Sequence, residues 1–253
     1  MAIKTILVSQ PKPEGEKSPY FDLAEKYDLK IDFRPFIHVE GVNAQEVRGQ
    51  RVNFAEHSAV IMTSKNAVDH FFRVAEEMRF QVPDTMKYFC ISEAVALYLQ
   101  KYVAYRKRKI FFGKQTIEEL ADVMKKHKTE KFLLPCTDIL RDKIPEVLES
   151  FGYQFTKAVL YRTVASDLSD LEDVYYDMLV FFSPGGIESL FKNFPDFKQN
   201  NTLIAAFGPT TANAVIKNSL RLDVHAPQPN LPSMTAAIEH FIKEVNKKEK
   251  SKK

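Results

Sequence analysis

The chain has 253 residues, enough for one large domain or for two domains of ordinary size. Its 45% hydrophobic and 27% charged residues are typical of a globular protein, and no apolar run reaches the roughly 18 to 20 residues that a membrane span needs. The formal net charge is +3, but residues 243–253 carry six Lys and two Glu, which leaves −1 for the rest and argues against membrane and nucleic-acid partners.

Cysteine and histidine usage narrows the chemistry. The only two cysteines, Cys90 and Cys136, form no CxxC pair, and we interpret them as buried thiols of a cytoplasmic protein. The six histidines are scattered without the spacing of metal ligands. The chain has no GxGxxG motif and no nucleophile elbow. We therefore expect no metal and no cofactor.

Short apolar strands alternate with amphipathic helices along the chain, which predicts an α/β fold with parallel sheets. Strands are predicted at 5–9, 59–63, 87–91, 109–112, 131–135, 178–182, 203–207 and 222–226. Helices follow most of them, for example at 66–78, 116–127 and 234–245. Two further extended stretches, 30–40 and 155–165, are about twice the usual strand length. Each is long enough to leave one sheet and enter another body.

The two halves of the chain resemble each other. AVIMTSKNAVDHFF aligns with LVFFSPGGIESLF at an offset of 119 residues, and KYFCISEAVALYLQK aligns with LIAAFGPTTANAVIK at an offset of 116. A unit with a long strand precedes each of these stretches. This order is compatible with two tandem domains, or with a discontinuous first domain into which the second is inserted. Periodicity does not choose between the two.

The stretch AAFGPTTANAV at 205–215 predicts a strand, a tight turn at Gly208 and a helix that begins near Pro209. Thr210 and Thr211 then lie on the first helical turn, whose free N–H groups favour an anion. The alternative is a helix N-cap and nothing more. The aligned turn in the other half has Ser92 and Glu93 in its place, and this asymmetry favours a function for the GPTT turn.

The neighbouring turn, FFSPGGIES at 181–189, holds two of the eight glycines in the chain. Gly185 and Gly186 would let the backbone approach a ligand, and Ser183 offers a hydroxyl; the alternative is a plain strand-to-helix turn. Its counterpart in the other half supplies further donors, Thr63, Ser64 and Lys65. Tyr161 lies on the long stretch 155–165, as a packing residue or as a hydroxyl donor.

Taken together, five motifs resemble the uroporphyrinogen-III synthase family across essentially the whole chain. They read TSKNAV, YRT, FFSPGG, FGPTTANAV and PSMTAAI, and their order and spacing are more specific than any one of them. The resemblance implies two doubly wound parallel-sheet α/β domains, the second inserted into the first and joined to it by a two-stranded linker. This favours insertion over tandem domains.

The domain bounds follow from this resemblance. Residues 1–36 and 166–253 are predicted to form the discontinuous first domain, and 41–158 the second. Residues 37–40 and 159–165 are predicted to be the crossing linker strands.

The activity implied by the resemblance is a cyclising lyase reaction of porphyrin and heme biosynthesis. The substrate, hydroxymethylbilane, is a linear tetrapyrrole with eight carboxylates, and it is closed to uroporphyrinogen III with inversion of ring D and loss of water. Tyr161 is the candidate for assisting the departing hydroxyl. We assign substrate binding to Thr210, Thr211, Gly208, Ser183, Gly185, Gly186, Thr63, Ser64 and Lys65. We expect a monomer.

A binding or sensor protein for an anionic metabolite, without catalysis, is the alternative. Two α/β domains and an anion-binding turn would look much the same in such a protein. Recovery of an intact ligand after incubation would favour this alternative, and an altered ligand would favour the enzyme.

Overall fold

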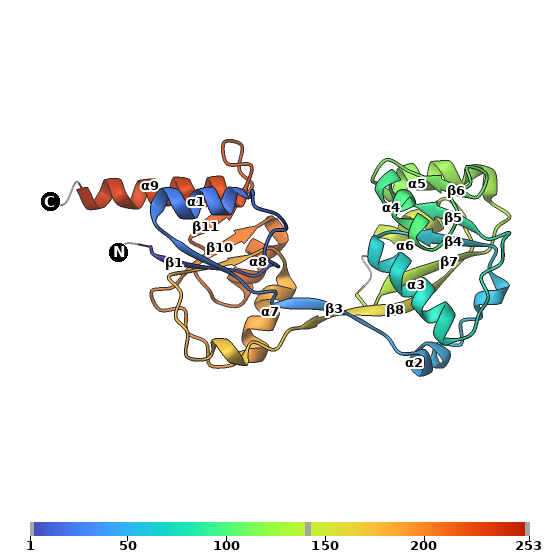
Figure 1. Cartoon of the computed structure of the whole chain (residues 1–253), viewed down its shortest axis with the longest axis horizontal. Coiled ribbons are helices and arrows are strands. Elements are labelled where there is room, and N and C mark those ends of the chain that lie inside the picture. The colour runs from blue at the N-terminus through green and yellow to red at the C-terminus, as the bar shows by residue number, and fades with distance from the viewer. Residues whose placement is uncertain (1–2, 140–142, 251–253) are drawn as a thin grey trace. The chain divides into compact units, whose positions relative to one another are not determined.

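The computed structural model describes residues 3–139 and 143–250 of the chain. It divides into two compact units, the first made of Met1–His38 with Val164–Lys253 and the second of Val39–Thr163, so that the second is inserted into the first. The chain passes between them twice, in β3 (Ile37–Gly41) and in β8 (Phe155–Ala165) (Figure 1). The narrower linker bounds expected from the sequence stay a prediction.

The first unit is a five-stranded parallel sheet in the order β11-β10-β9-β1-β2. Its strands are β1 (Thr5–Val8), β2 (Lys30–Phe33), β9 (Met178–Phe181), β10 (Leu203–Phe207) and β11 (Val224–Ala226). Its helices are α1 (Pro19–Tyr27), α7 (Pro184–Asn193), α8 (Pro209–Lys217), α9 (Met234–Lys250) and the short 3-10 helix η4 (Ser169–Leu171). The α1 and α9 helices pack on one face of the sheet, and α7 and α8 on the other (Figure 1).

Continuous apolar runs in the strands explain this layering. All four residues of β9 are buried: Met178 and Val180 face the cluster under α9, whereas Leu179 and Phe181 face the cluster under α7 and α8. A strand covered on both faces must be apolar at every position, which is typical of parallel sheets.

The second unit is a six-stranded sheet in the order β3-β8-β7-β4-β5-β6. Its remaining strands are β4 (Ala59–Met62), β5 (Lys87–Cys90), β6 (Ile110–Phe112) and β7 (Phe132–Thr137). Its helices are α2 (Ala44–Gly49), α3 (Lys65–Glu77), α4 (Glu93–Tyr98), α5 (Ile117–Met124) and α6 (Lys143–Ser150), with 3-10 helices η1 (Phe54–Glu56), η2 (Leu99–Lys101) and η3 (Lys125–His127). The α3 and α4 helices cover one face, and α5 and α6 the other.

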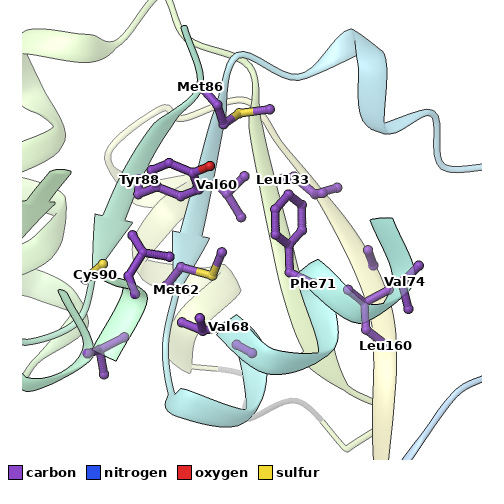
Figure 2. Packing of buried hydrophobic residues seen from close by; sticks show 14 of the residues in the cluster. Val60, Met62, Val68, Phe71, Val74, Met86, Tyr88, Cys90, Leu133 and Leu160 are labelled. Atoms are coloured by element: carbon purple, nitrogen blue, oxygen red, sulfur yellow. The ribbon is translucent and has the colours of Figure 1, made fainter. Parts of the chain in front are cut away.

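Phe71 of α3 lies at the centre of the core on the α3 face, as Figure 2 shows. Its side chain is fully buried among residues of the central strands, including Val60 and Leu133. Its ring stacks on that of Phe54, with the two centroids 5.8 Å apart. This packing holds α3 against the sheet.

The predicted fold class and most predicted strands are confirmed, but one long strand is wrong. The stretch 30–40 is two strands in two different sheets, β2 and β3, which are separated at Arg34–Pro35–Phe36. Pro35 has no N–H group to donate to a strand ladder. The other long stretch, 155–165, is the single strand β8.

Both cysteines are buried free thiols, as expected, and burial raises the pKa of Cys90 to about 12. Among the helices of the described ranges, none combines the length and the apolar character needed to cross a bilayer.

Candidate functional site

Each sheet has one place where the strand order reverses, and several of the predicted site residues follow a strand beside it. In the first unit the reversal is between β1 and β9, and in the second it is between β4 and β7. Loops that leave neighbouring parallel strands in opposite directions open a crevice at the carboxyl ends of the strands, where doubly wound sheets bind ligands. Ser183 follows β9, and Thr63 and Ser64 follow β4.

The turn after β9 is held by a helix cap. Ser183 is the N-cap of α7, and its Oγ accepts a hydrogen bond from the Gly186 amide at 3.3 Å. The Ser183 hydroxyl proton therefore remains available to a ligand, whereas a ligand would have to compete with Ser183 for the Gly186 amide. A Cβ atom at Gly186 would lie 3.2 Å from the Phe181 ring and 3.7 Å from Ser9 Oγ, so a larger residue here would be tight against the ring.

The turn after β10 depends on the conformation of Gly208. This residue has φ +83° and ψ 155°, a region that is essentially restricted to glycine, and its N–H donates to the Ala226 carbonyl at 2.6 Å. The α8 helix begins at Pro209, as expected, with Gly208 as its N-cap and no side-chain cap. The alternative interpretation of the threonines as capping residues is therefore wrong, because both lie inside the first turn.

The two threonines of this turn differ in exposure. Thr210 is exposed, whereas the Thr211 side chain is only 1% exposed and its Oγ1 has no hydrogen-bond partner. A buried hydroxyl is normally paired, because leaving it unpaired costs roughly 1–3 kcal/mol. The uncapped N–H groups at the start of this helix are suited to an anion. The Thr211 hydroxyl has no partner in the fold, but it is covered and would have to be uncovered to join them.

The corresponding turn after β5 is different. Ser92 is the N-cap of α4 but makes no side-chain cap hydrogen bond, and exposed Glu93 occupies the first turn. A carboxylate already stands at the positive end of this helix, so a second anion would be repelled.

The turn after β4 carries the remaining predicted donors. Ser64 is the N-cap of α3, and its Oγ accepts from the Ala67 amide at 3.1 Å. Thr63 is half-buried beside it. Lys65 is exposed at the first helical position, with its Nζ 5.2 Å from the centroid of the Tyr98 ring. Thr63, Ser64 and Lys65 thus lie together at one strand end.

Tyr161, on β8, lies next to the residues of the turn after β4. Its hydroxyl lies 3.5 Å from Ser64 Oγ, and its side chain is 7% exposed. A register shift between β7 and β8 pairs Cys136 with Val159 but Thr137 with Tyr161, which leaves Leu160 as the extra residue. Leu160 and Tyr161 both face the α3 core although they are consecutive, because the bulge re-aims Tyr161.

The electrostatic surroundings of Tyr161 keep its phenol neutral. Burial raises the pKa of this hydroxyl above its ordinary value, and hydrogen bonds to the Ser64 and Thr63 hydroxyls offset this only in part. At neutral pH Tyr161 is therefore a proton donor and not a phenolate.

The structure thus gathers the predicted residues into one set per unit. Sequence reasoning missed Ser9 beside Gly186, and it missed His70 and Arg73, which lie on α3 near Tyr161. His70 and Arg73 sit in an amphipathic helix without a motif around them, so no local signal distinguished them from surface residues. Across the part of the chain that the structure describes, no three His, Cys, Asp or Glu side chains cluster as metal ligands.

Comparison with known protein families identifies the family to which this chain belongs. The family model described as uroporphyrinogen-III synthase HemD matches residues 18–236, which is most of the chain. The chain belongs to the uroporphyrinogen-III synthase family.

Individual relatives agree with this family. A uroporphyrinogen-III synthase of Chlorobaculum parvum is 23% identical over 95% of this chain and 100% of its own length. The uroporphyrinogen-III synthase of Saccharomyces cerevisiae is 28% identical over 49% of this chain and 50% of its own length. The crystal structure of uroporphyrinogen-III synthetase from Helicobacter pylori, at 17% identity, covers 96% of this chain and 100% of its own with a TM-score of 0.60, and so shares the fold. The family model and the two relatives identified by sequence point to uroporphyrinogen-III synthase, an enzyme of tetrapyrrole biosynthesis.

Proposed function

We propose that this protein is a uroporphyrinogen-III synthase, which closes hydroxymethylbilane to uroporphyrinogen III with inversion of ring D and loss of water. The family match over residues 18–236 carries this proposal. The unpaired Thr211 hydroxyl at an uncapped helix N-terminus supports it, because the substrate carries eight carboxylates.

The reaction requires control of conformation more than strong acids or bases. Hydroxide leaves the terminal carbon of the linear substrate and takes up a proton as water, which leaves an electrophilic azafulvene. Attack by the substituted carbon of ring D gives a spiro intermediate, which reopens and recloses with ring D inverted. Without an enzyme the chain closes without inversion, so the protein must hold one conformer for the reacting carbons.

Substrate carboxylates would be bound by neutral donors and one cation. In the first unit these are the turns at Ser183–Gly186 and Gly208–Thr211, and in the second unit the turn at Thr63–Lys65. Each turn begins a helix, where N–H groups and the partial positive charge stabilise an anion. The hydroxyls of Thr211 and Ser183 add donors that the fold itself does not use.

Tyr161 is the proposed donor to the departing hydroxyl. Its phenol is neutral, and it lies next to the Ser64 hydroxyl at a strand end where doubly wound sheets bind ligands. A neutral phenol already carries the proton that it can donate to a leaving oxygen.

The reaction product tests the proposed function directly. Purified protein supplied with freshly prepared hydroxymethylbilane should form uroporphyrinogen III faster than the spontaneous closure, which gives only isomer I. Chromatography of the oxidised products separates the two isomers. Isomer I alone, at the spontaneous rate, would overturn the proposal, and tight binding of unaltered substrate would favour a binding protein instead.

Replacing Tyr161 by phenylalanine should lower kcat roughly tenfold, the low end of the range for general acid assistance, because the leaving group is already activated. KM should change less, since the ring and its packing are retained. Steady-state kinetics with hydroxymethylbilane measure both values. An unchanged kcat would mean that Tyr161 is only a packing residue.

Tyr153→Phe is the matched control for this substitution. Tyr153 is another buried tyrosine of the second unit, but it belongs to the cluster on the opposite face of the sheet, and its hydroxyl donates to the Ala121 carbonyl at 2.5 Å. Loss of this hydrogen bond should reduce stability by about 1 kcal/mol and leave kcat unchanged.

We further propose that the protein acts as a monomer in the cytoplasm, without a nucleic-acid partner. The near-neutral charge of the chain outside residues 243–253 supports the last point. Sedimentation velocity measures the oligomeric state, and a dimer at micromolar concentration would contradict the first.

A further inference from the structure

The imidazole of His70 lies flat against the ring of Tyr161. The two ring centroids are 5.2 Å apart, with an angle of 19° between the ring planes. His70 is half-buried on α3, six residues after Ser64, and Tyr161 reaches it from β8. The phenol therefore has a stacking partner on its ring and a hydroxyl partner at its tip.

Arg73 fixes the orientation and the tautomer of His70. Its Nε donates a hydrogen bond to His70 Nδ1 at 3.1 Å, so this ring nitrogen is an acceptor and the ring proton of the neutral imidazole lies on Nε2. A protonated His70 could not accept this bond. The arrangement therefore holds only while His70 is neutral.

Arg73 is in turn fixed by the backbone beside Tyr161. Its second terminal nitrogen donates to the Val42 carbonyl at 2.8 Å and to the Leu160 carbonyl at 3.1 Å. A Cβ atom at Gly41 would lie 2.8 Å from the guanidinium, so a side chain there would displace Arg73 from its place at the end of β3. Leu160 is the bulge residue immediately before Tyr161. Arg73 thus holds both the backbone of the bulge and the ring that packs on Tyr161.

We propose that His70 is a positioning residue, which, together with Arg73, holds the Tyr161 phenol in the orientation needed to assist the departing hydroxyl. This proposal rests on the proposed synthase function. His70 acts by stacking and not by proton relay, because the rings of His70 and Tyr161 lie face to face, His70 Nδ1 accepts from Arg73, and the Tyr161 hydroxyl pairs with Ser64.

The charges around His70 determine at which pH this arrangement is lost. Burial lowers the pKa of His70 below its ordinary value, and the nearby Arg73 lowers it further, whereas Asp69 and Glu77 of the same helix oppose the shift. Tyr161, on the strand packed against it, is neutral. The folded protein therefore binds fewer protons at His70 than the unfolded chain does. The corresponding stabilisation is full above about pH 6.5 and is lost as the pH falls through the folded-state pKa.

Four variants test the proposal kinetically. His70→Ala should lower kcat by about two- to tenfold, the factor that an aromatic pair contributes, with little change in KM. His70→Phe retains the stacked ring and should restore most of the lost kcat. His70→Ala should have no further effect in a Tyr161→Phe protein, because it acts through the phenol. His127→Ala is the matched control: His127 also packs on aromatic rings, Phe111 and Phe89, but on the opposite face of the sheet, and its loss should leave kcat unchanged.

The pH profile separates positioning from simple packing. Relative to wild type, His70→Phe should lack the decrease in kcat at acidic pH that follows His70 protonation, because phenylalanine does not titrate. The comparison uses the ratio of the kcat of the variant to that of wild type at each pH, because the titration of the substrate carboxylates affects both proteins equally and cancels. The proposal would be contradicted if kcat decreased equally at acidic pH in wild type and in His70→Phe. It would also be contradicted if His70→Ala lowered kcat in the Tyr161→Phe protein as much as it does in wild type.

A readout without substrate distinguishes failure of this proposal from failure of the proposed function. In protein labelled with ¹³C-tyrosine, the Tyr161 ring resonance, identified by its absence in Tyr161→Phe, should shift with pH as His70 titrates. The pH dependence should vanish in His70→Phe. A resonance that does not respond to pH in wild type would overturn the His70 arrangement whether or not the protein forms isomer III.

Discussion

In a protein that carries both Thr210→Ala and Thr211→Ala, kcat/KM for hydroxymethylbilane should decrease by well over tenfold while the protein remains folded. Each hydrogen bond to a substrate carboxylate that is lost should remove roughly 1.5–3 kcal/mol of binding. The stability should change little, because neither threonine caps α8 and Thr211 Oγ1 has no partner in the fold. Steady-state kinetics and thermal unfolding of the same protein measure the two effects.

Thr211→Val makes the same test more sharply. Valine has the shape of threonine without the hydroxyl, and replacing a buried, unpaired hydroxyl by a methyl group should leave Tm unchanged or raise it. Activity should nevertheless fall. A fall in stability with turnover of the folded molecules spared would instead mean that the Thr211 hydroxyl has only a structural role.

Ser92→Ala is the control in the other half of the chain. Ser92 begins α4 without a side-chain cap hydrogen bond, and Glu93 follows it. This substitution should change neither activity nor stability much, because the turn repels an anion and has no cap to lose. Equal damage from Ser92→Ala, or parallel loss of stability and activity in the double mutant, would show that the GPTT turn is only structural.

Phe71→Ala should lower the free energy of unfolding of the protein by about 3–5 kcal/mol. The Phe71 side chain is fully buried in the core under α3 (Figure 2). It packs edge-to-face against Phe72, with ring centroids 5.0 Å apart, in addition to stacking on Phe54. Its removal leaves a cavity under α3, the helix that carries Ser64, His70 and Arg73. Chemical denaturation measures the change.

An exposed apolar residue of the same unit is the control for this core substitution. Leu97 on α4 is 53% exposed, and Leu97→Ala should alter the stability by no more than about 0.5 kcal/mol. A similar loss in both variants would mean that Phe71 is not at the centre of this core. If Phe71→Ala also lowers kcat at temperatures where it is folded, then the position of α3 matters for Tyr161.

The two units show how one architecture can carry different chemistry. Both contain a strand–helix repeat whose turns lie at the carboxyl ends of parallel strands. In one unit the second turn of the repeat has an unpaired hydroxyl and no acidic residue, whereas in the other the same place has Glu93. The difference lies in a few side chains at helix starts and not in the path of the chain.

Local sequence determined the alternation of strands and helices, the turn at Gly208 and the helix start at Pro209. These features depend on residues close to one another in the chain: apolar runs form buried strands, glycine alone adopts φ near +83°, and proline suits the first helical position. The family motifs lie mostly on the same turns, and they could be recognised in the sequence for the same reason. The break of 30–40 at Pro35 was also within reach of local reasoning, because proline lacks the N–H group that a strand ladder uses.

Only the tertiary structure decided how the turns are used. Tyr161 meets Ser64 across 97 positions of sequence, and Arg73 reaches the Leu160 carbonyl across 87. The bulge that aims Tyr161 at α3 arises from pairing between β7 and β8, which no single segment encodes. Whether a hydroxyl is paired, as in Ser64, or buried and unpaired, as in Thr211, depends on neighbours that are distant in the chain and are brought close only by packing.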